Sequence, residues 1–430
     1  MSWIHGLFEN SYTMLMGEIR MPGLHIFIPN ELPLVERVMN EAKAFPKHAM
    51  MVEVLEPAIG ISTFTANGED WEQQRAMINP AFQHTALAKT LPLMCDAARA
   101  LIERIGTDGG ERVIDIDPLM THVAADIIFR TLFSVPLDAA GSAVIHRRFN
   151  RFQRFAQSGA VFRLYGLPTF GYKGRSEREA RGIHEVFAGI VQDRYRRFHG
   201  AGEVVHRDIL QSLFEARHPV SGAPFTVRQV MEQVSLIFLA GHETSASLMS
   251  WATYLLAECG ALQQRMRDEV VHLTGERGFT MDALKAMTLT RNVVRETLRL
   301  YPPVAFLPRD TVCPVTMRGK PIAPGDMLVI SPWLVQRNAR NWRDPHAFDP
   351  DRFEEPDGQE MLKKAWLPFG KGPRLCIGAG FAQQEAMVVL AHLVRHFCLA
   401  SPAGDKPEPV SRLTLRPRNG IRIALKPIGG

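Results

Sequence analysis

Three things are scarce in this chain of 430 residues: long apolar runs, paired cysteines and an excess of one charge. No stretch approaches the roughly 18 consecutive apolar residues that a membrane-spanning helix needs. Residues 1–20 carry no basic leader followed by an apolar run, so they lack the form of a secretory signal. We therefore expect a cytoplasmic protein without a membrane anchor.

Cysteine is rare, and its pattern does not indicate a disulfide framework. The cysteines are odd in number, and none belongs to a Cys-x-x-Cys pair. They are Cys95, Cys259, Cys313, Cys376 and Cys398. This pattern is typical of a reducing compartment, where we expect most of these thiols to be small core residues.

Charge is nearly balanced, with 50 Lys and Arg against 45 Asp and Glu and a formal net charge of +5. The small excess of basic residues is not clustered in the sequence. It favours a basic face for docking a partner protein over a nucleic-acid-binding surface. Arginine and phenylalanine alternate between residues 147 and 155, and an amphipathic helix with a solvated basic side explains that pattern most simply. An apolar share of 46% excludes a disordered chain.

Most of the chain has a helical pattern. Strands are indicated by a hairpin at 15–29, short β-type runs at 312–317 and 327–330, and a closing hairpin around Asn419 and Gly420. Helices are predicted at 70–83, 87–105, 121–133, 142–156, 177–197 and 226–257, with another after Cys376.

No linker divides the chain, so we predict a single domain spanning residues 1–430. Its fold class is mainly α with a minor β region (α+β), because strands and helices do not alternate. The portions at about 15–66 and 303–335 are expected to be richer in β structure. Those at about 67–302 and 377–396 are expected to be helical.

The helix predicted at 226–257 is apolar on nearly every face, so it should cross the core. Thr226 and Gln229 form a plausible capping box at its start. Gly241 in its middle costs roughly 1 kcal/mol relative to alanine, and burial of Glu243 costs more unless it is paired. Either this segment needs space and a proton route, or it is a packing notch with a solvated Glu243. The segment alone leaves the two interpretations even.

The stretch 369–378 is the most informative. Its glycines and proline hold Cys376 in a tight loop just before a helix, with Arg374 beside it. A helix N-terminus, backbone N–H groups and an arginine all favour an ionised sulfur. Such a sulfur could bind a metal or attack an electrophile, and the loop contains no histidine to serve as the base for attack.

This stretch resembles the haem-binding signature of the cytochrome P450 family. The matching residues are Phe369, Gly370, Gly372, Arg374, Cys376 and Gly378. The resemblance runs from about Asp70 to the carboxyl end. It implies a triangular helical bundle that encloses haem b, with Cys376 as the iron ligand. The expected member is of the soluble bacterial type.

Glu296 and Arg299 match the family's Glu-x-x-Arg pair, and Arg352 matches the arginine that completes a structural triad. The spacing i, i+3 alone places Glu296 and Arg299 on one helical face, where an exposed ion pair would be the ordinary interpretation. The family pattern instead implies a buried triad that stabilises the core around the haem.

The resemblance also assigns residues to the haem propionates and to oxygen activation. Trp71, Arg75, Arg309 and Arg374 would bind the propionates. Ala240 and Gly241 would leave space over the iron, while Thr244 and Glu243 would handle oxygen and protons. A zinc-protease motif starting at His242 is excluded, because the second histidine is replaced by Ala246.

Substrate contacts are expected from apolar residues in several segments, and for any one of them ordinary core packing is the simpler interpretation. These residues are Phe64, Phe162, Leu239, Val304 and Phe306. The resemblance implies a monooxygenase that inserts one oxygen atom from O2 into an apolar small molecule.

We recognise no flavin or iron–sulfur module in the sequence, so a ferredoxin and its reductase are the expected electron donors. Two alternatives remain: an enzyme of the same fold that uses peroxide or performs another oxidation, and a non-catalytic haem sensor.

Overall fold

The computed structural model describes residues 3–21, 23–164, 168, 171–275 and 278–428. Its α-helices are α1 (Leu32–Asn40), α2 (Ala49–Ile59), α3 (Gly68–Ile78), α4 (His84–Ile105), α5 (Ile116–Phe133), α6 (Ala139–Leu164), α7 (Tyr172–Ala201), α8 (Ile209–Glu215), α9 (Val227–Ala257), α10 (Gly260–Thr274), α11 (Met281–Ala286), α12 (Thr288–Leu300), α13 (Pro332–Val335), α14 (Pro356–Lys364) and α15 (Ala379–His396). Short 3-10 turns include Pro350–Glu354 and Gly372–Arg374.

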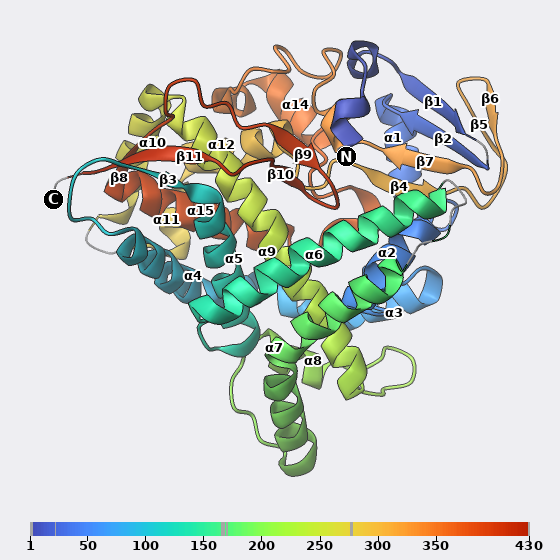
Figure 1. Ribbon diagram of the computed structural model, residues 1–430, viewed down its shortest axis with the longest axis horizontal. Helices are drawn as coiled ribbons and strands as arrows, with labels where there is room; N and C mark the ends of the chain where they lie inside the picture. The colour runs from blue at the N-terminus through green and yellow to red at the C-terminus, as the bar shows by residue number, and fades with distance from the viewer. Residues whose placement is uncertain (1–2, 22, 165–167, 169–170, 276–277, 429–430) are drawn as a thin grey trace.

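The strands form small sheets at the edges of the helical body (Figure 1). They are β1 (Met16–Met21), β2 (Leu24–Pro29), β3 (Arg112–Asp115), β4 (Leu307–Asp310), β5 (Val315–Met317), β6 (Lys320–Ile322), β7 (Met327–Ile330), β8 (Phe397–Ala400), β9 (Pro409–Ser411), β10 (Leu415–Pro417) and β11 (Arg422–Pro427). The largest sheet has the order β1-β2-β7-β4, and a second has the order β3-β11-β8. The mainly α, α+β architecture is confirmed.

The long helix α9 crosses the middle of the molecule (Figure 1), and the predicted capping box is present at its start. The Gln229 N–H donates to Thr226 Oγ1 at 3.3 Å, and the Thr226 N–H donates to Gln229 Oε1 at 2.9 Å. A Cβ on Gly241 would meet Ile128 Cδ1 at 2.7 Å, so the glycine lets α5 approach closely. Gly241 is thus a packing notch, whereas Glu243 is buried rather than solvated.

Two expectations about β structure are wrong. The portion 15–66 begins with the predicted β1–β2 hairpin but continues into α1 and α2. Pro33 lies in the first turn of α1, where a proline is well tolerated, and the helix buries Val35, Val38 and Met39 at its helical spacing. Near the C-terminus the expected hairpin does not form, because β10 pairs with β9 while β11 pairs with β3 and β8.

The cysteines do not behave as core residues. Cys95 is half-buried, and the other cysteines are exposed, which corrects the expectation that most of them pack in the interior. All five are free thiols. Among the described helices, none combines the length and apolarity required to cross a membrane.

A buried ionic network joins α12 to the segment that follows it. Glu296 and Arg299 are fully buried, and Arg299 donates to both Glu296 carboxylate oxygens at 2.8 Å. Arg352 donates to Glu296 Oε1 at 2.9 Å, and the Asp349 N–H donates to the same oxygen at 3.1 Å. The remaining N–H groups of both arginines reach backbone carbonyls between residues 336 and 347. The three residues meet as the sequence predicts.

Replacement of Arg299 by alanine should destabilise the protein strongly, because it leaves Glu296 buried with one cation fewer. We expect a loss of about 3–5 kcal/mol in the free energy of unfolding, measured by urea titration. The control is Arg265→Ala, which breaks an ion pair with Asp351 whose side chains are both more than half exposed. That control should cost less than about 1 kcal/mol. Equal losses in the two variants would contradict the structural role of the triad.

Candidate functional site

The loop 369–378 is shaped by backbone constraints. The Cys376 N–H donates to the Phe369 carbonyl at 2.9 Å, and the Leu375 N–H donates to the Gly372 carbonyl at 3.0 Å. Gly372 has a φ of 70°, and a Cβ there would lie 2.6 Å from the Met39 carbonyl oxygen of α1. Glycine is therefore required where the loop contacts α1. The result is a fixed position for Cys376 just before α15.

Cys376 faces space inside the protein. Its side chain is exposed by accessible area, yet burial raises the pKa of its thiol. Ala240 is likewise exposed, although it lies between buried residues in the middle of α9. Each of these two residues therefore borders accessible space.

The electrostatics of Cys376 correct one expectation. The Gly378 N–H, Arg75 and Lys47 lower the pKa of the thiol, but burial outweighs them and the pKa is raised. The protein alone therefore does not favour the thiolate. A bound metal ion would, because a coordinating thiol loses its proton outright. Within the described residues no three His, Cys, Asp or Glu side chains cluster, so Cys376 would serve as a single protein ligand.

Cations from three segments converge beside this space. Arg75 donates to Asn79 Oδ1 at 2.8 Å and to the Leu375 carbonyl at 3.0 Å. Arg374 lies 4.1 Å above the Trp71 ring and donates to the Ala66 carbonyl at 2.9 Å. Arg309 is 5% exposed, and burial lowers its pKa to about 10. In the described part of the chain, none of these arginines forms an ion pair. The predicted Trp71, Arg75, Arg309 and Arg374 are thus brought together.

A fourth cation, Lys47, was not predicted. Its backbone pairs with Arg309 in an antiparallel bridge, which places the two side chains on the same face. Lys47 Nζ donates to the Phe64 carbonyl at 2.8 Å and lies 3.2 Å from the centroid of the Phe64 ring. Burial, followed by repulsion from Arg309, Arg374 and Arg75, lowers its pKa well below the ordinary value. No motif in the sequence marks this lysine, because its position depends on pairing with a strand 262 positions later (309 − 47).

These residues fit a haem. Cations withdrawn from water without anionic partners are unfavourable, and a haem offers two propionates that would pair with them. Cys376 would supply a sulfur ligand to the iron, and the accessible Ala240 would leave room for the group.

The oxygen-activation residues diverge in the structure. Thr244 Oγ1 donates to the Ala240 carbonyl at 2.6 Å. The Glu243 carboxylate instead accepts from Thr414 Oγ1 at 3.0 Å and from Gln153 Nε2 at 3.2 Å, with Arg416 Nε 3.8 Å away. Burial alone would raise the pKa of Glu243. The opposing effect of Arg416, His242 and the two hydrogen-bond donors is larger, so the pKa is lowered and the carboxylate form is favoured. Thr244 and Glu243 are therefore neighbours in sequence but have different polar partners.

The predicted substrate residues have different surroundings: Leu239 belongs to the main hydrophobic core and Phe64 packs against it, whereas Phe306 packs against a smaller cluster. Leu239 is buried in α9, and the Lys47 ammonium lies 3.2 Å from the centroid of the Phe64 ring. The Phe162 ring stacks on the Tyr172 ring, with 5.5 Å between their centroids. Val304 and Phe306 are half-buried just before β4.

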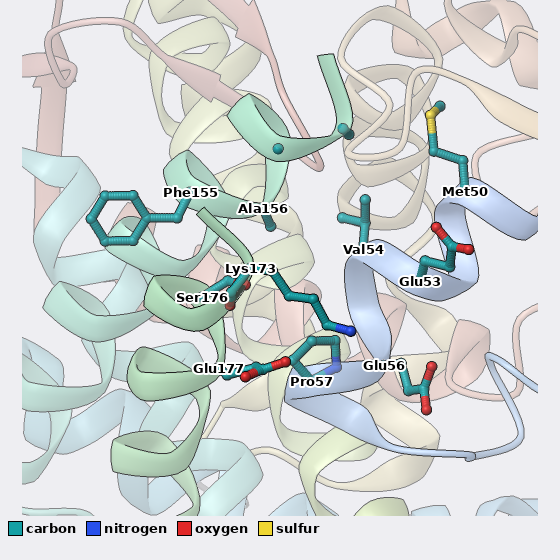
Figure 2. A pocket seen from close by; sticks show the side chains of 12 residues that line it. Met50, Glu53, Val54, Glu56, Pro57, Phe155, Ala156, Lys173, Ser176 and Glu177 are labelled. Atoms are coloured by element: carbon teal, nitrogen blue, oxygen red, sulfur yellow. Dashed lines mark hydrogen bonds between the residues drawn. The ribbon is translucent and has the colours of Figure 1, made fainter. Parts of the chain in front are cut away.

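A separate pocket of about 410 Å³ lies between α2, α6 and α7. Its apolar lining includes Met50, Val54, Pro57, Phe155 and Ala156. Figure 2 shows Lys173 and Glu177 extending from α7 toward Pro57 of α2, and Glu53 and Glu56 of α2 also line the pocket, so both helices contribute charged groups to it. Of the named substrate residues, none lines this pocket.

Comparison with known proteins identifies the family. A family model described as Cytochrome P450 matches residues 6–424. Taurochenodeoxycholic 6 alpha-hydroxylase of Sus scrofa is 30% identical over 414 residues, which cover 90% of this chain and 79% of the relative. Cytochrome P450 4A11 of Homo sapiens is 30% identical over 405 residues, with 89% and 76% covered. Cytokinin hydroxylase of Arabidopsis thaliana is 29% identical over 382 residues, with 86% and 73% covered.

The fold, the cysteine loop and the anion site define a haem-thiolate monooxygenase. The chain belongs to the cytochrome P450 family, its cofactor is haem b, and its reaction is hydroxylation with one oxygen atom from O2. The relatives named above come from mammals and plants, so they give no support to the expected bacterial type.

Replacement of Lys47 by methionine should weaken haem binding, because one of the cations at the anion site is lost. We expect haem to transfer to apomyoglobin about tenfold faster, as the loss of one hydrogen bond to a charged group implies. Lys43→Met is the control, since that side chain is 85% exposed. A rate unchanged in Lys47→Met, or changed equally in both variants, would show that Lys47 does not bind haem.

Proposed function

We propose that this enzyme hydroxylates an apolar organic substrate, with Cys376 as the iron ligand. The observation that carries the proposal is the position of Cys376. It lies beside four cations, of which Arg309 is buried and Lys47, Arg75 and Arg374 are half-buried, and none of the four has an anionic partner among the described residues. Bound haem supplies the activation of dioxygen.

The surrounding side chains have separate tasks in this proposal. The haem carboxylates would be bound by Arg75, Arg309, Arg374 and Lys47. The Trp71 ring packs against the Arg374 guanidinium. The small side chain of Ala240 would leave space for the haem and for dioxygen. The Thr244 hydroxyl donates its own hydrogen to the Ala240 carbonyl, so its oxygen is left to accept a hydrogen bond from a water and to orient that water.

The substrate is proposed to be apolar because the segments around the interior space are apolar. The substrate would contact Leu239, Val304 and Phe306. It would enter through the pocket between α2, α6 and α7. Since charged residues from both α2 and α7 line that pocket, a substrate with polar groups would fit it better than a pure hydrocarbon.

We propose separate redox proteins as electron donors, a ferredoxin and its reductase, and a cytoplasmic protein of the bacterial type. The mild positive charge of the chain, +5, supports an acidic donor such as a ferredoxin. Lys371 would attract an acidic partner. Its Nζ lies 3.0 Å from Glu36 Oε1, and this ion pair reduces the positive charge that Lys371 offers to a partner. Turnover with ferredoxin, with a diflavin reductase and with peroxide distinguishes the donors. Product formed only with peroxide would favour the peroxide-driven alternative, and no product under any condition would favour a sensor.

Replacement of Cys376 by serine should remove the thiolate ligand. We expect the reduced carbon monoxide complex to lose its thiolate-type absorption band, because a serine oxygen does not replace the sulfur. The control is Cys398→Ser, which changes an exposed thiol on β8 and should leave the spectrum unaltered. If the Cys376→Ser band survives, another residue holds the iron.

Replacement of Thr244 by alanine should uncouple electron use from product formation, since the hydroxyl that orients water is removed. We expect about a tenfold fall in product formed per electron consumed, which corresponds to the loss of one hydrogen bond of roughly 1.4 kcal/mol. Thr253→Ala is the matched control, because Thr253 Oγ1 makes the same bond, to the Met249 carbonyl at 2.7 Å, on the same helix. Unchanged coupling in Thr244→Ala would remove the assigned role.

A further inference from the structure

One hydrogen bond joins α6 to the oxygen-activation stretch 240–244 of α9. Gln153 Nε2 of α6 donates to Glu243 Oε1 of α9 at 3.2 Å, and both side chains are buried. In the described part of α6, no other side chain is hydrogen-bonded to α9. The nearby amide of Asn150 instead donates to His146 at 2.9 Å, within α6 itself. Gln153 is therefore the polar connection between the two helices.

An aromatic contact lies one turn earlier on the same face of α6. The Phe149 ring packs edge-on against the His242 ring, with 5.5 Å between the ring centroids. Residues four positions apart share a helical face, so Phe149 and Gln153 approach α9 together. This face of α6 is thus positioned against residues 242 and 243 by one aromatic and one polar contact.

Glu243 is the fixed end of this connection, because other elements hold it as well. Its Oε1 atom also accepts from Thr414 Oγ1 at 3.0 Å, and Arg416 Nε lies 3.8 Å away. Arg416 in turn donates to Asp117 of α5, with 3.0 Å between Nη2 and Oδ2. Loss of the Gln153 amide would therefore leave Glu243 with its remaining partners in place.

The α6 end of the connection belongs to a wall of the pocket between α2, α6 and α7. Phe155 and Ala156 line that pocket and lie two and three positions after Gln153 (Figure 2). Backbone hydrogen bonds join each residue of a helix to the fourth one along, so these three residues move as one unit. The hydrogen bond to Glu243 therefore limits how far this part of the wall can move.

An apolar side chain would pack at position 153 without that bond. The neighbouring Phe149, Phe152 and Ala156 are buried and apolar, and burial of an amide is unfavourable unless it is hydrogen-bonded. Methionine has nearly the same length as glutamine and would avoid this cost. What glutamine adds is a hydrogen bond to a carboxylate, which is stronger than a bond between neutral groups.

We propose that Gln153 is a positioning residue that fixes the α6 wall of the pocket to Glu243. With the bond in place, Phe155 and Ala156 are ordered before a ligand arrives, and a ligand binds more tightly when it does not have to order its site. Because coupling between sites is reciprocal, a ligand in the pocket in turn strengthens the bond to Glu243. The proposal rests on the proposed function only in taking this pocket as the substrate entrance.

Hydrogen exchange of the haem-loaded protein tests the connection without substrate or turnover. In Gln153→Met we expect the backbone amides of residues 149–156 to exchange about tenfold faster, because one hydrogen bond to a charged group is lost. The control is Asn150→Leu, which removes an amide whose hydrogen bond lies within α6 and should leave α6 packed on α9. Equal exchange in the two variants would overturn the proposal.

Ligand binding tests the effect on the pocket. The probe is 1-dodecylimidazole, whose azole binds haem iron while its apolar chain extends along the substrate entrance, and imidazole alone is the matched control ligand. We expect the dissociation constant of 1-dodecylimidazole to rise about tenfold in Gln153→Met, whereas that of imidazole should not change. An unchanged affinity for the long ligand would refute the proposal.

Thr414→Val separates the position of α6 from the charge of Glu243. This variant removes the other hydrogen-bond donor to the same carboxylate oxygen, and that donor comes from the segment just before β10. It should therefore leave hydrogen exchange of residues 149–156 and both dissociation constants as in the wild type. If Thr414→Val weakens 1-dodecylimidazole binding as much as Gln153→Met does, the effect comes from Glu243 and the proposal is wrong.

A second variant covers the case in which Gln153→Met does not fold. Gln153→Asn keeps the amide but is one methylene too short to reach Glu243, so it should show the same two changes, and wild-type values would contradict the proposal. Imidazole binding with a normal haem spectrum in the wild type shows that the haem site is intact. Failure of the connection and failure of the haem assignment are thus distinguished.

Discussion

The buried carboxylate of Glu296 is the constraint on which the rest of the site depends. Two arginines and a backbone N–H surround it, and those arginines reach carbonyls along the segment 336–347. This network fixes a long irregular stretch against α12. Gln336 of that stretch donates to carbonyls at the end of α12 and accepts from the Leu367 N–H at 2.6 Å, which leads directly into the cysteine loop. The cysteine loop is thus connected, through Gln336, to the ion-pair network around Glu296.

A second constraint comes from charge that the described protein does not balance. Lys47, Arg75, Arg309 and Arg374 meet from separate parts of the chain, and in the described residues no carboxylate pairs with them. Such a group is unfavourable in isolation and favourable around a dianionic cofactor. The acids of the core differ in the same respect. Arg416 helps to keep the pKa of Glu243 low, whereas Glu385 of α15 is fully buried with no hydrogen-bond partner among the described residues, and burial raises its pKa to about 8.

The sequence predicts some of these features and not others, for physical reasons. Local rules predict the capping box at Thr226, the cysteine loop and the i, i+3 pair of Glu296 and Arg299, because each depends on a few adjacent residues. Lys47 and Glu385 could not be predicted, since their environments depend on pairing with β4 and packing on α9. The turn at Asn419 and Gly420 was misjudged as a hairpin because β11 finds better partners in distant strands. The substrate residues also remain predictions, because their contacts with a substrate depend on how distant segments pack.

The central claim is that the enzyme inserts one atom of dioxygen into its substrate. It is tested most directly by turnover under ¹⁸O2 in unlabelled water, with an apolar substrate chosen by its spin-state shift and electrons from a ferredoxin and its reductase. The account predicts a hydroxylated product that carries one ¹⁸O atom. A product whose new oxygen comes from water, or product formation that needs no O2, would contradict it.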